Sequence, residues 1–228
     1  MQSVVSETDP GDRSLAARSA ERAVAARYSA YLEEVQRLIR AGVAVMERTQ
    51  STNPRVSEIV REAGLSNQAF YRHFRSKDEL LVAILDDGLR QLVGYLTHQM
   101  DKEPTGLGKV RRWVEGILAQ ATNPAAARAT RGVILNSVRL AELFPDDSRR
   151  SEDVLRAPLR EAIALAVERG ERTRADPERD AEAVYRLAMG SMQAFLSGAD
   201  SPSRADVAHV VAFSLGGIGA AVRSPDGA

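Results

Sequence analysis

The stretch GLSNQAFYRHFRSKDELL, residues 64–81, carries the clearest structural signal in this chain of 228 residues. A polar Ser-Asn-Gln run leads into four ring-bearing residues, although aromatic residues make up only 5% of the whole chain. Phe70 and Phe74 are four residues apart, so on a helix they share one face and can anchor it to its neighbours. Asn67 and Tyr71 share another face. We therefore expect a short helix that buries its rings and presents polar side chains to a partner.

Helix-capping and helix-breaking residues before this helix predict a second short helix on its N-terminal side. The apolar residues of VSEIVREAG (56–64) recur at helical spacing, and Gly64 is placed to close that helix at its C-terminus. Asn53 followed by Pro54 predicts its start, as a cap residue with proline at the first helical position. Ser66 is the expected N-cap of the next helix, over about 67–74. Two short helices joined by a tight turn are typical of a helix-turn-helix.

The rest of the chain also has helical periodicity, with no competing β-alternating segment and no fixed-period repeat. The capping box of Ser76 and Glu79 predicts the start of a long helix. Further helices are expected over residues 28–49, 106–121, 124–143, 150–169 (kinked or split at Pro158), 178–197 and 204–222. The fold class is therefore all-α. The expected division is a flexible N-terminal extension (1–24), a three-helix helix-turn-helix domain (25–76), a larger helical domain (77–222) and a flexible tail (223–228).

Composition narrows the possible functions. The chain has no cysteine, which excludes disulfides and thiolate metal sites. Its N-terminus has no continuous apolar segment of a secretory signal, and no run approaches the roughly 18 apolar residues of a membrane span, so a cytoplasmic protein with no membrane partner is expected. The net charge is zero, but residues 13–77 contain 12 Lys and Arg against 6 Asp and Glu, a charge of +6. Such an asymmetry points to a nucleic-acid surface, although arginine-rich helices also arise from composition alone.

Enzymatic chemistry finds little support in the sequence. The three histidines (His73, His98 and His209) are scattered, with no pair at metal-ligand spacing, and no glycine-rich phosphate loop follows a strand. We therefore expect no catalytic residues, no metal and no cofactor. An enzyme built on a helical bundle is the least favoured class.

The segment VSEIVREAGLSNQAFYRHFRSKDELL (56–81) resembles the N-terminal domain of the TetR (tetracycline-repressor) family of bacterial transcriptional regulators. The stretch GERTRADPERDAEAVYRLAMGSMQAFLSG (170–198) is similar to the penultimate helix of that family. This chain departs from the family pattern at two positions. Arg55, just before the first segment, stands where the family usually has Thr, and Gln68, within the segment, stands where a small residue is common. The matching positions are Val56, Ile59, Ala63, Gly64, Ser66, Tyr71, His73, Phe74, Ser76, Lys77 and Leu80, with Leu65 and Phe70 conservative.

The resemblance implies that the third helix enters the major groove of operator DNA. Tyr71 and His73 would grip phosphates, and amides such as Asn67 and Gln68 can pair with adenine edges. Lys77 stands at a helix N-terminus, where a cation opposes the macrodipole, which favours an external anionic partner. The whole predicted DNA-binding set is Arg55, Ser66, Asn67, Gln68, Ala69, Tyr71, Arg72, His73 and Lys77.

The resemblance further implies a homodimer on palindromic double-stranded DNA, a repressor that a small hydrophobic or amphipathic effector releases. The alternative is an effector-independent repressor or architectural protein. The predicted effector-binding residues are Trp113, Asn136, Arg139, Met189 and Met192, because polar residues on an otherwise apolar helix can converge on a ligand and thioethers adapt to irregular cavities. The predicted dimer interface lies on the last two helices, at Val184, Leu187, Ser191, Phe195, Val207, Val211, Ser214 and Ile218.

Overall fold

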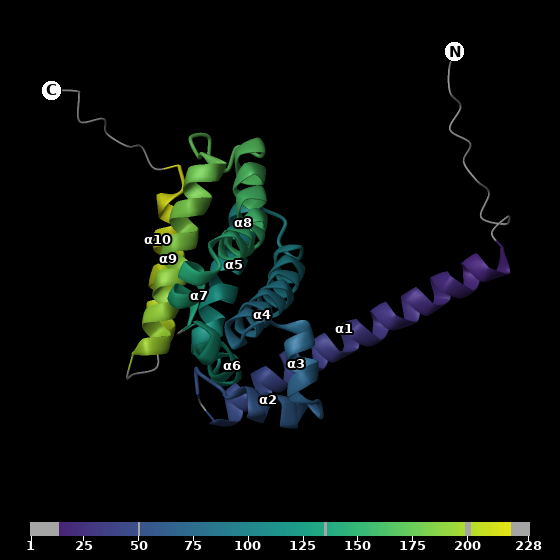
Figure 1. Ribbon diagram of the computed structural model, residues 1–228. Helices are drawn as coiled ribbons and strands as arrows, with labels where there is room; N and C mark the ends of the chain where they lie inside the picture. Colours follow the sequence, from purple (N-terminus) through teal and green to yellow (C-terminus); the bar gives the residue numbers. More distant parts are fainter. Residues whose placement is uncertain (1–13, 50, 135, 199–201, 220–228) are drawn as a thin grey trace, which may run out of the picture.

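The computed structural model describes residues 14–49, 51–134, 136–198 and 202–219, in which ten α-helices and no strand occur. The all-α prediction is confirmed. A small N-terminal helical unit lies at one end of a larger helical bundle (Figure 1). No helix in these ranges is long and apolar enough to cross a membrane.

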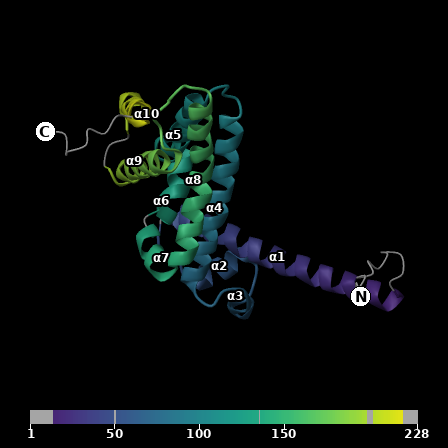
Figure 2. The same cartoon turned by 90° about the horizontal axis from the view of Figure 1, so that it is seen from above.

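The first helix, α1 (Leu15–Thr49), is 35 residues long and is buried only from Leu38 onward. Its N-terminal half projects away from the rest of the molecule in both views (Figures 1 and 2). Residues 15–24 belong to the predicted N-terminal extension, and in the structure they form the first turns of α1, as the alanine-rich run from Ser14 allows, since alanine has the highest helix propensity. The predictions for residues 1–13 and 223–228 lie outside the described residues.

The N-terminal unit is built from the second half of α1 together with α2 (Val56–Ala63), α3 (Asn67–His73) and the start of α4. Phe70 and Leu80 are fully buried in its core. The turn between α2 and α3 is a Schellman motif: Leu65 N donates to Val60 O at 2.9 Å and Gly64 N donates to Arg61 O at 3.2 Å. Gly64 has φ 61°, a left-handed conformation that glycine adopts without a steric cost.

The start of α2 differs from the prediction. The helix begins at Val56 with Arg55 at the N-cap position, so Asn53 and Pro54 precede the helix and do not cap it. The Arg55 amide donates to the Glu58 carboxylate at 3.1 Å, which satisfies one of the exposed backbone donors at this end.

The long helix α4 (Lys77–Met100) joins the two parts of the molecule. Its first turns bury Leu80 and Ile84 in the N-terminal core, whereas Leu96 and Met100 belong to the core of the larger bundle. The predicted Ser76 cap is present, since Ser76 Oγ accepts from Glu79 N at 3.1 Å. The Glu79 carboxylate reaches the amide of Arg75 at 2.5 Å. A movement of α4 would therefore change side-chain packing in both cores.

The larger bundle surrounds α5 (Gly106–Thr122), whose Trp113 is fully buried and donates from Nε1 to Leu155 O at 3.1 Å. Gly106 permits close packing of α5 on α8, because a Cβ there would lie 2.4 Å from Ala166 N. The predicted helix over 124–143 is two helices, of which the first ends at Ile134 and the second begins at Ser137. The predicted helix from 150 begins at Pro145 and continues through Pro158. The bundle consists of α4, α5, α6 (Pro124–Ile134), α7 (Ser137–Leu143), α8 (Pro145–Glu168), α9 (Pro177–Ser197) and α10 (Arg204–Gly217).

Candidate nucleic-acid interface and effector cavity

Helix α3 has one buried and one exposed face. Phe70 is fully buried and its ring lies 5.8 Å from that of Phe74, which fixes the helix on the N-terminal core. On the other face Asn67 and Gln68 are exposed, and Tyr71 is 61% exposed. This exposure leaves the phenol hydroxyl of Tyr71 accessible to a partner.

Two members of the predicted DNA-binding set lie on the inner side of α3. Ala69 is only 7% exposed. The His73 side chain is fully buried, with Nε2 2.6 Å from the Glu34 carboxylate and its ring 4.3 Å from that of Tyr31. The prediction that they contact DNA is therefore corrected: Tyr31 and Glu34 of α1 enclose the His73 imidazole, and Ala69 is buried, so neither side chain lies on the exposed face of α3.

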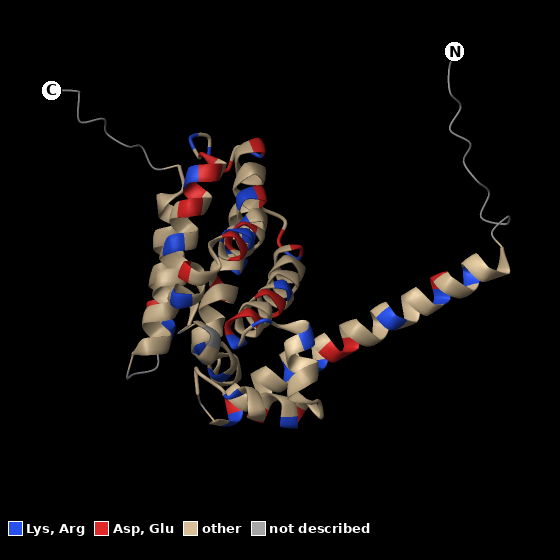
Figure 3. Cartoon of the chain, in the orientation of Figure 1, with Lys and Arg blue, Asp and Glu red and all other residues tan. Residues whose placement is uncertain are grey.

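The cationic members of the set are partly engaged within the protein. Arg72 forms an exposed ion pair with Glu34 at 2.7 Å. Lys77 donates from Nζ to the side-chain oxygen of Asn53, so this lysine links the α1–α2 loop to the start of α4. Arg55 is exposed at the N-terminus of α2, and Ser66 Oγ caps α3 by accepting from Ala69 N at 3.1 Å. Lys and Arg recur along α1, α2 and α3 (Figure 3).

Two residues outside the predicted set hold the geometry of this surface. Glu34 binds both Arg72 and His73 from the neighbouring helix. Arg37 donates from Nη2 to the carbonyl oxygens of Ala63 and Gly64, at 2.5 and 3.1 Å, and so caps the C-terminus of α2. Sequence periodicity does not reveal either role, because both side chains lie on a solvated helix face and find partners far along the chain.

Acid should weaken the contact that Glu34 makes. Hydrogen bonds from His73 and then from Arg72 hold the pKa of the Glu34 carboxyl below its ordinary value of 4.5. A carboxyl whose folded-state pKa is lowered contributes stability that is complete above the unfolded pKa and is lost as pH falls through the folded pKa. We expect Glu34→Gln to have a lower melting temperature than the wild type at pH 6, and the difference to shrink as pH falls toward 3. Glu33→Gln is the matched control, and an equal effect of the two variants would contradict the role of Glu34.

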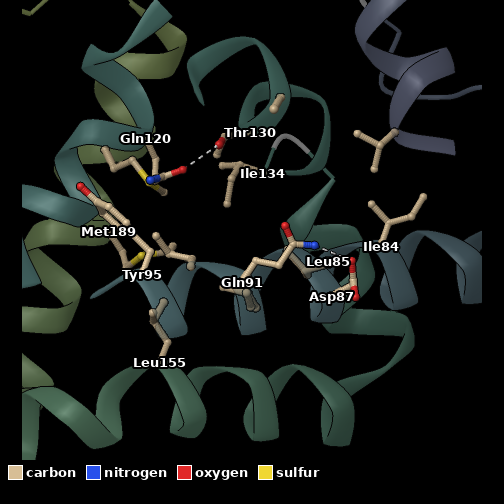
Figure 4. A pocket seen from close by; sticks show the side chains of 16 residues that line it. Ile84, Leu85, Asp87, Gln91, Tyr95, Gln120, Thr130, Ile134, Leu155 and Met189 are labelled. Atoms are coloured by element: carbon tan, nitrogen blue, oxygen red, sulfur yellow. Dashed lines mark hydrogen bonds between the residues drawn. The ribbon is translucent and has the colours of Figure 1, made fainter. Parts of the chain in front are cut away.

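A cavity of about 360 Å³ lies between α4, α5, α6, α8 and α9 (Figure 4). Its wall is mainly aliphatic, and Met189 and Met192, two of the residues proposed from the sequence to bind an effector, are part of it. Gln120 and Thr130 form a hydrogen bond with each other at its edge, at 3.4 Å. Tyr95 also lines the cavity, although no sequence signal distinguished it from the other residues of α4.

Three predicted effector-binding residues lie elsewhere. Trp113 is enclosed in the bundle core and is not part of the cavity wall. The Asn136 side-chain amide donates to Thr52 O at 2.5 Å and to Gly132 O at 3.1 Å. Arg139 forms an ion pair with Asp78 at 2.8 Å. Because the polar groups of Asn136 and Arg139 are bound to the N-terminal unit, these residues link the two parts of the molecule and do not line the cavity.

The exposed surface of α9 and α10 contains many small residues. Gly190, Gly216 and Gly217 each have open space where a side chain would point, and Phe213, outside the predicted interface, is 65% exposed. A shallow groove of about 130 Å³ runs between the two helices. Of the predicted interface residues, Leu187, Ser191, Phe195, Val207 and Val211 are half-buried, whereas Val184, Ser214 and Ile218 are buried against their own chain.

A short helix set on a tight turn, with exposed amides and a tyrosine, defines a helix-turn-helix DNA-binding protein. Residues 38–84 match the sequence model of the bacterial regulatory proteins of the tetR family. The chain belongs to this TetR family of DNA-binding transcriptional regulators. No curated protein matches the chain in sequence.

Solved structures share the fold over most of the chain. The fatty acid degradation regulator FadR from Bacillus halodurans is 19% identical, with a TM-score of 0.65 over 81% of this chain and 95% of that one. FadR from Bacillus subtilis, solved with stearoyl-CoA, is 14% identical, with a TM-score of 0.62 over 79% and 95%. RolR, solved with resorcinol, is 16% identical, with a TM-score of 0.58 over 84% and 90%. At these identities the likeness concerns the fold.

Proposed function

We propose that this protein is a homodimeric transcriptional repressor that leaves a palindromic operator when a small hydrophobic or amphipathic molecule enters the cavity beneath α4. The observation that carries the proposal is the position of that cavity. The same helix whose first turns pack in the N-terminal core also forms one wall of the cavity, through Leu85, Leu89 and Leu92. Two fold relatives are described with bound small molecules, stearoyl-CoA and resorcinol, which supports an effector for this chain as well.

For DNA binding we assign the direct contacts to the exposed face of α3 and the residues beside it. Asn67 and Gln68 read base edges, and Tyr71 binds phosphate. Arg55 and Ser66 lie at the N-termini of α2 and α3, where they can reach the DNA backbone. Arg72 and Lys77 add positive charge while they retain their contacts with Glu34 and Asn53.

For coupling between the two parts, the α6–α7 junction supplies the second link beside α4. Thr130 and Ile134 of α6 line the cavity, and Asn136, just beyond them, donates to Thr52 O in the loop before α2. Arg139 of α7 pairs with Asp78 in the first turn of α4, and this hydrogen bond lowers the pKa of the Asp78 carboxyl. An effector that displaces α6 would therefore change contacts on the N-terminal unit.

The test starts with an operator selected from random duplexes and measures its binding by fluorescence anisotropy with and without ligand. Resorcinol and straight-chain alcohols serve as compact and elongated probes. A ligand that binds should weaken operator affinity by roughly 5- to 150-fold, the range of typical allosteric coupling. Arg139→Ala should keep the ligand affinity and lose part of this coupling. Ligand binding that leaves operator affinity unchanged would favour the effector-independent repressor instead.

A further inference from the structure

Beside the first cavity lies a second one of about 360 Å³, bordered by α4, α6, α7, α8 and α9. The two share part of their lining. The side chains that line both cavities are Leu85, Leu89, Ile134, Leu155 and Met189. All five are aliphatic or thioether side chains, and Met189 has an unbranched, flexible chain that readily changes its packing. The partition can therefore open by side-chain rotation alone.

The two cavities differ in chemistry. The first is mainly aliphatic, and four of its polar side chains are paired with each other, Gln120 with Thr130 and Gln91 with Asp87, which leaves the Tyr95 hydroxyl as its additional polar group. The second also has aliphatic residues on its wall, but it is lined in addition by four hydroxyl-bearing residues, Ser137, Ser148, Ser151 and Tyr185, of which Ser137 donates to Ile134 O. Burial raises the pKa of Tyr185 to about 12, so its phenol remains neutral at physiological pH. One end of the combined space is therefore apolar and the other is suited to hydrogen bonding.

The charges at the second cavity disfavour an anion. Arg186 lines this cavity, but its guanidinium is bound to Glu182 at 2.5 Å. Glu152, on the opposite wall, has no hydrogen bond or ion pair with any other described residue. Arg156, whose guanidinium carbon lies 5.8 Å from the centre of the Tyr185 ring, is likewise paired, with Asp153 and Glu182. An anionic group entering here would therefore meet the unneutralised Glu152 carboxylate, whereas both nearby cations are already paired.

We propose that the two cavities form one elongated site for an amphiphile, with its apolar chain in the first cavity and a neutral, hydrogen-bonding head group in the second. The proposal rests on the proposed function, because it names the class of effector that the regulator recognises. A combined space of this kind lies within the roughly 300–1,000 Å³ range of ligand sites.

Chain length provides the first test, by isothermal titration of straight-chain primary alcohols from hexan-1-ol to decan-1-ol. A continuous site should bind each longer alcohol about three- to fourfold more tightly, since each added methylene is buried. Met189 lines both cavities, so Met189→Phe should narrow their connection and flatten the rise of affinity with chain length: decan-1-ol should lose at least ten times more affinity than hexan-1-ol. An affinity that stops rising near hexan-1-ol in the wild type would show two separate cavities and overturn the proposal.

The head group provides the second test. Decanoate should bind at least tenfold more weakly than decan-1-ol at pH 7.5, and Glu152→Gln should reduce this difference by strengthening the binding of decanoate more than that of the alcohol. Glu152 is exposed, so its replacement leaves the core intact. Tighter binding of decanoate than of decan-1-ol would overturn the assignment of the head group.

Failure of this proposal is distinguishable from failure of the proposed function. If resorcinol binds and releases the operator but no alcohol binds, the effector-responsive repressor stands and the elongated site falls. If the alcohols bind as expected and DNA affinity never changes, the site stands and the effector-released repressor falls.

Discussion

A monomeric variant of this protein should bind its operator about 100 to 10,000 times more weakly than the wild type. In a dimer the two DNA-binding domains are linked, so they gain affinity by binding one DNA molecule together. Ala183→Glu with Phe213→Glu is the variant of choice. Both side chains line the groove between α9 and α10 and are exposed, so the two charges face solvent in a monomer and oppose their copies in a dimer.

Light scattering after size exclusion gives the mass, and fluorescence anisotropy gives the operator affinity of the same sample. Val154→Glu, a charge introduced at a 47% exposed valine of α8 outside the groove, is the matched control and should remain dimeric. A dimer that survives the double substitution would place the interface elsewhere. A monomer that binds the operator as tightly as the wild type would contradict the need for two DNA-binding domains.

Substitutions on α3 should separate affinity from specificity. Tyr71→Ala should weaken binding to the operator and to unrelated DNA alike, because phosphate contacts carry no sequence information. Gln68→Ala should cost roughly 1–3 kcal/mol on the operator and relax the preference at one base pair of each half-site. Both side chains are exposed, so neither change disturbs the packing of Phe70.

The measurement is binding of each variant to a library of operators with single base-pair changes, together with a non-operator duplex. His73→Ala differs in kind, because the side chain is buried between α1 and α3. It should lower the melting temperature of the protein as well as its DNA affinity. If Gln68→Ala leaves the preference at every position unchanged, Gln68 does not read bases; an operator-specific loss in Tyr71→Ala would overturn the phosphate assignment.

Local sequence determined most of the secondary structure. Gly64 between two short apolar patterns predicts the α2–α3 turn, and Ser66 and Ser76 predict helix starts that the structure contains. These features depend on interactions over three to five residues, so they can be read without knowledge of the fold. The local pattern also predicted that Asn53 caps α2, but the N-cap is Arg55. Nothing in the local pattern shows that the Asn53 side chain is bound to Lys77, 24 residues later.

Tertiary structure decided which polar residues are available for function. His73 and Tyr71 look alike in the motif, yet the approach of α1 buries the imidazole against Glu34 and leaves the phenol exposed. The sequence pattern placed Arg139 and Asn136 on one apolar helix, as expected of ligand-binding residues, but Asn136 precedes α7 and their partners are Asp78 and Thr52, 61 and 84 residues away. A residue's spacing fixes the face of the helix on which it lies, whereas its partner depends on which helices pack against that face, and this packing arises from contacts across the whole chain.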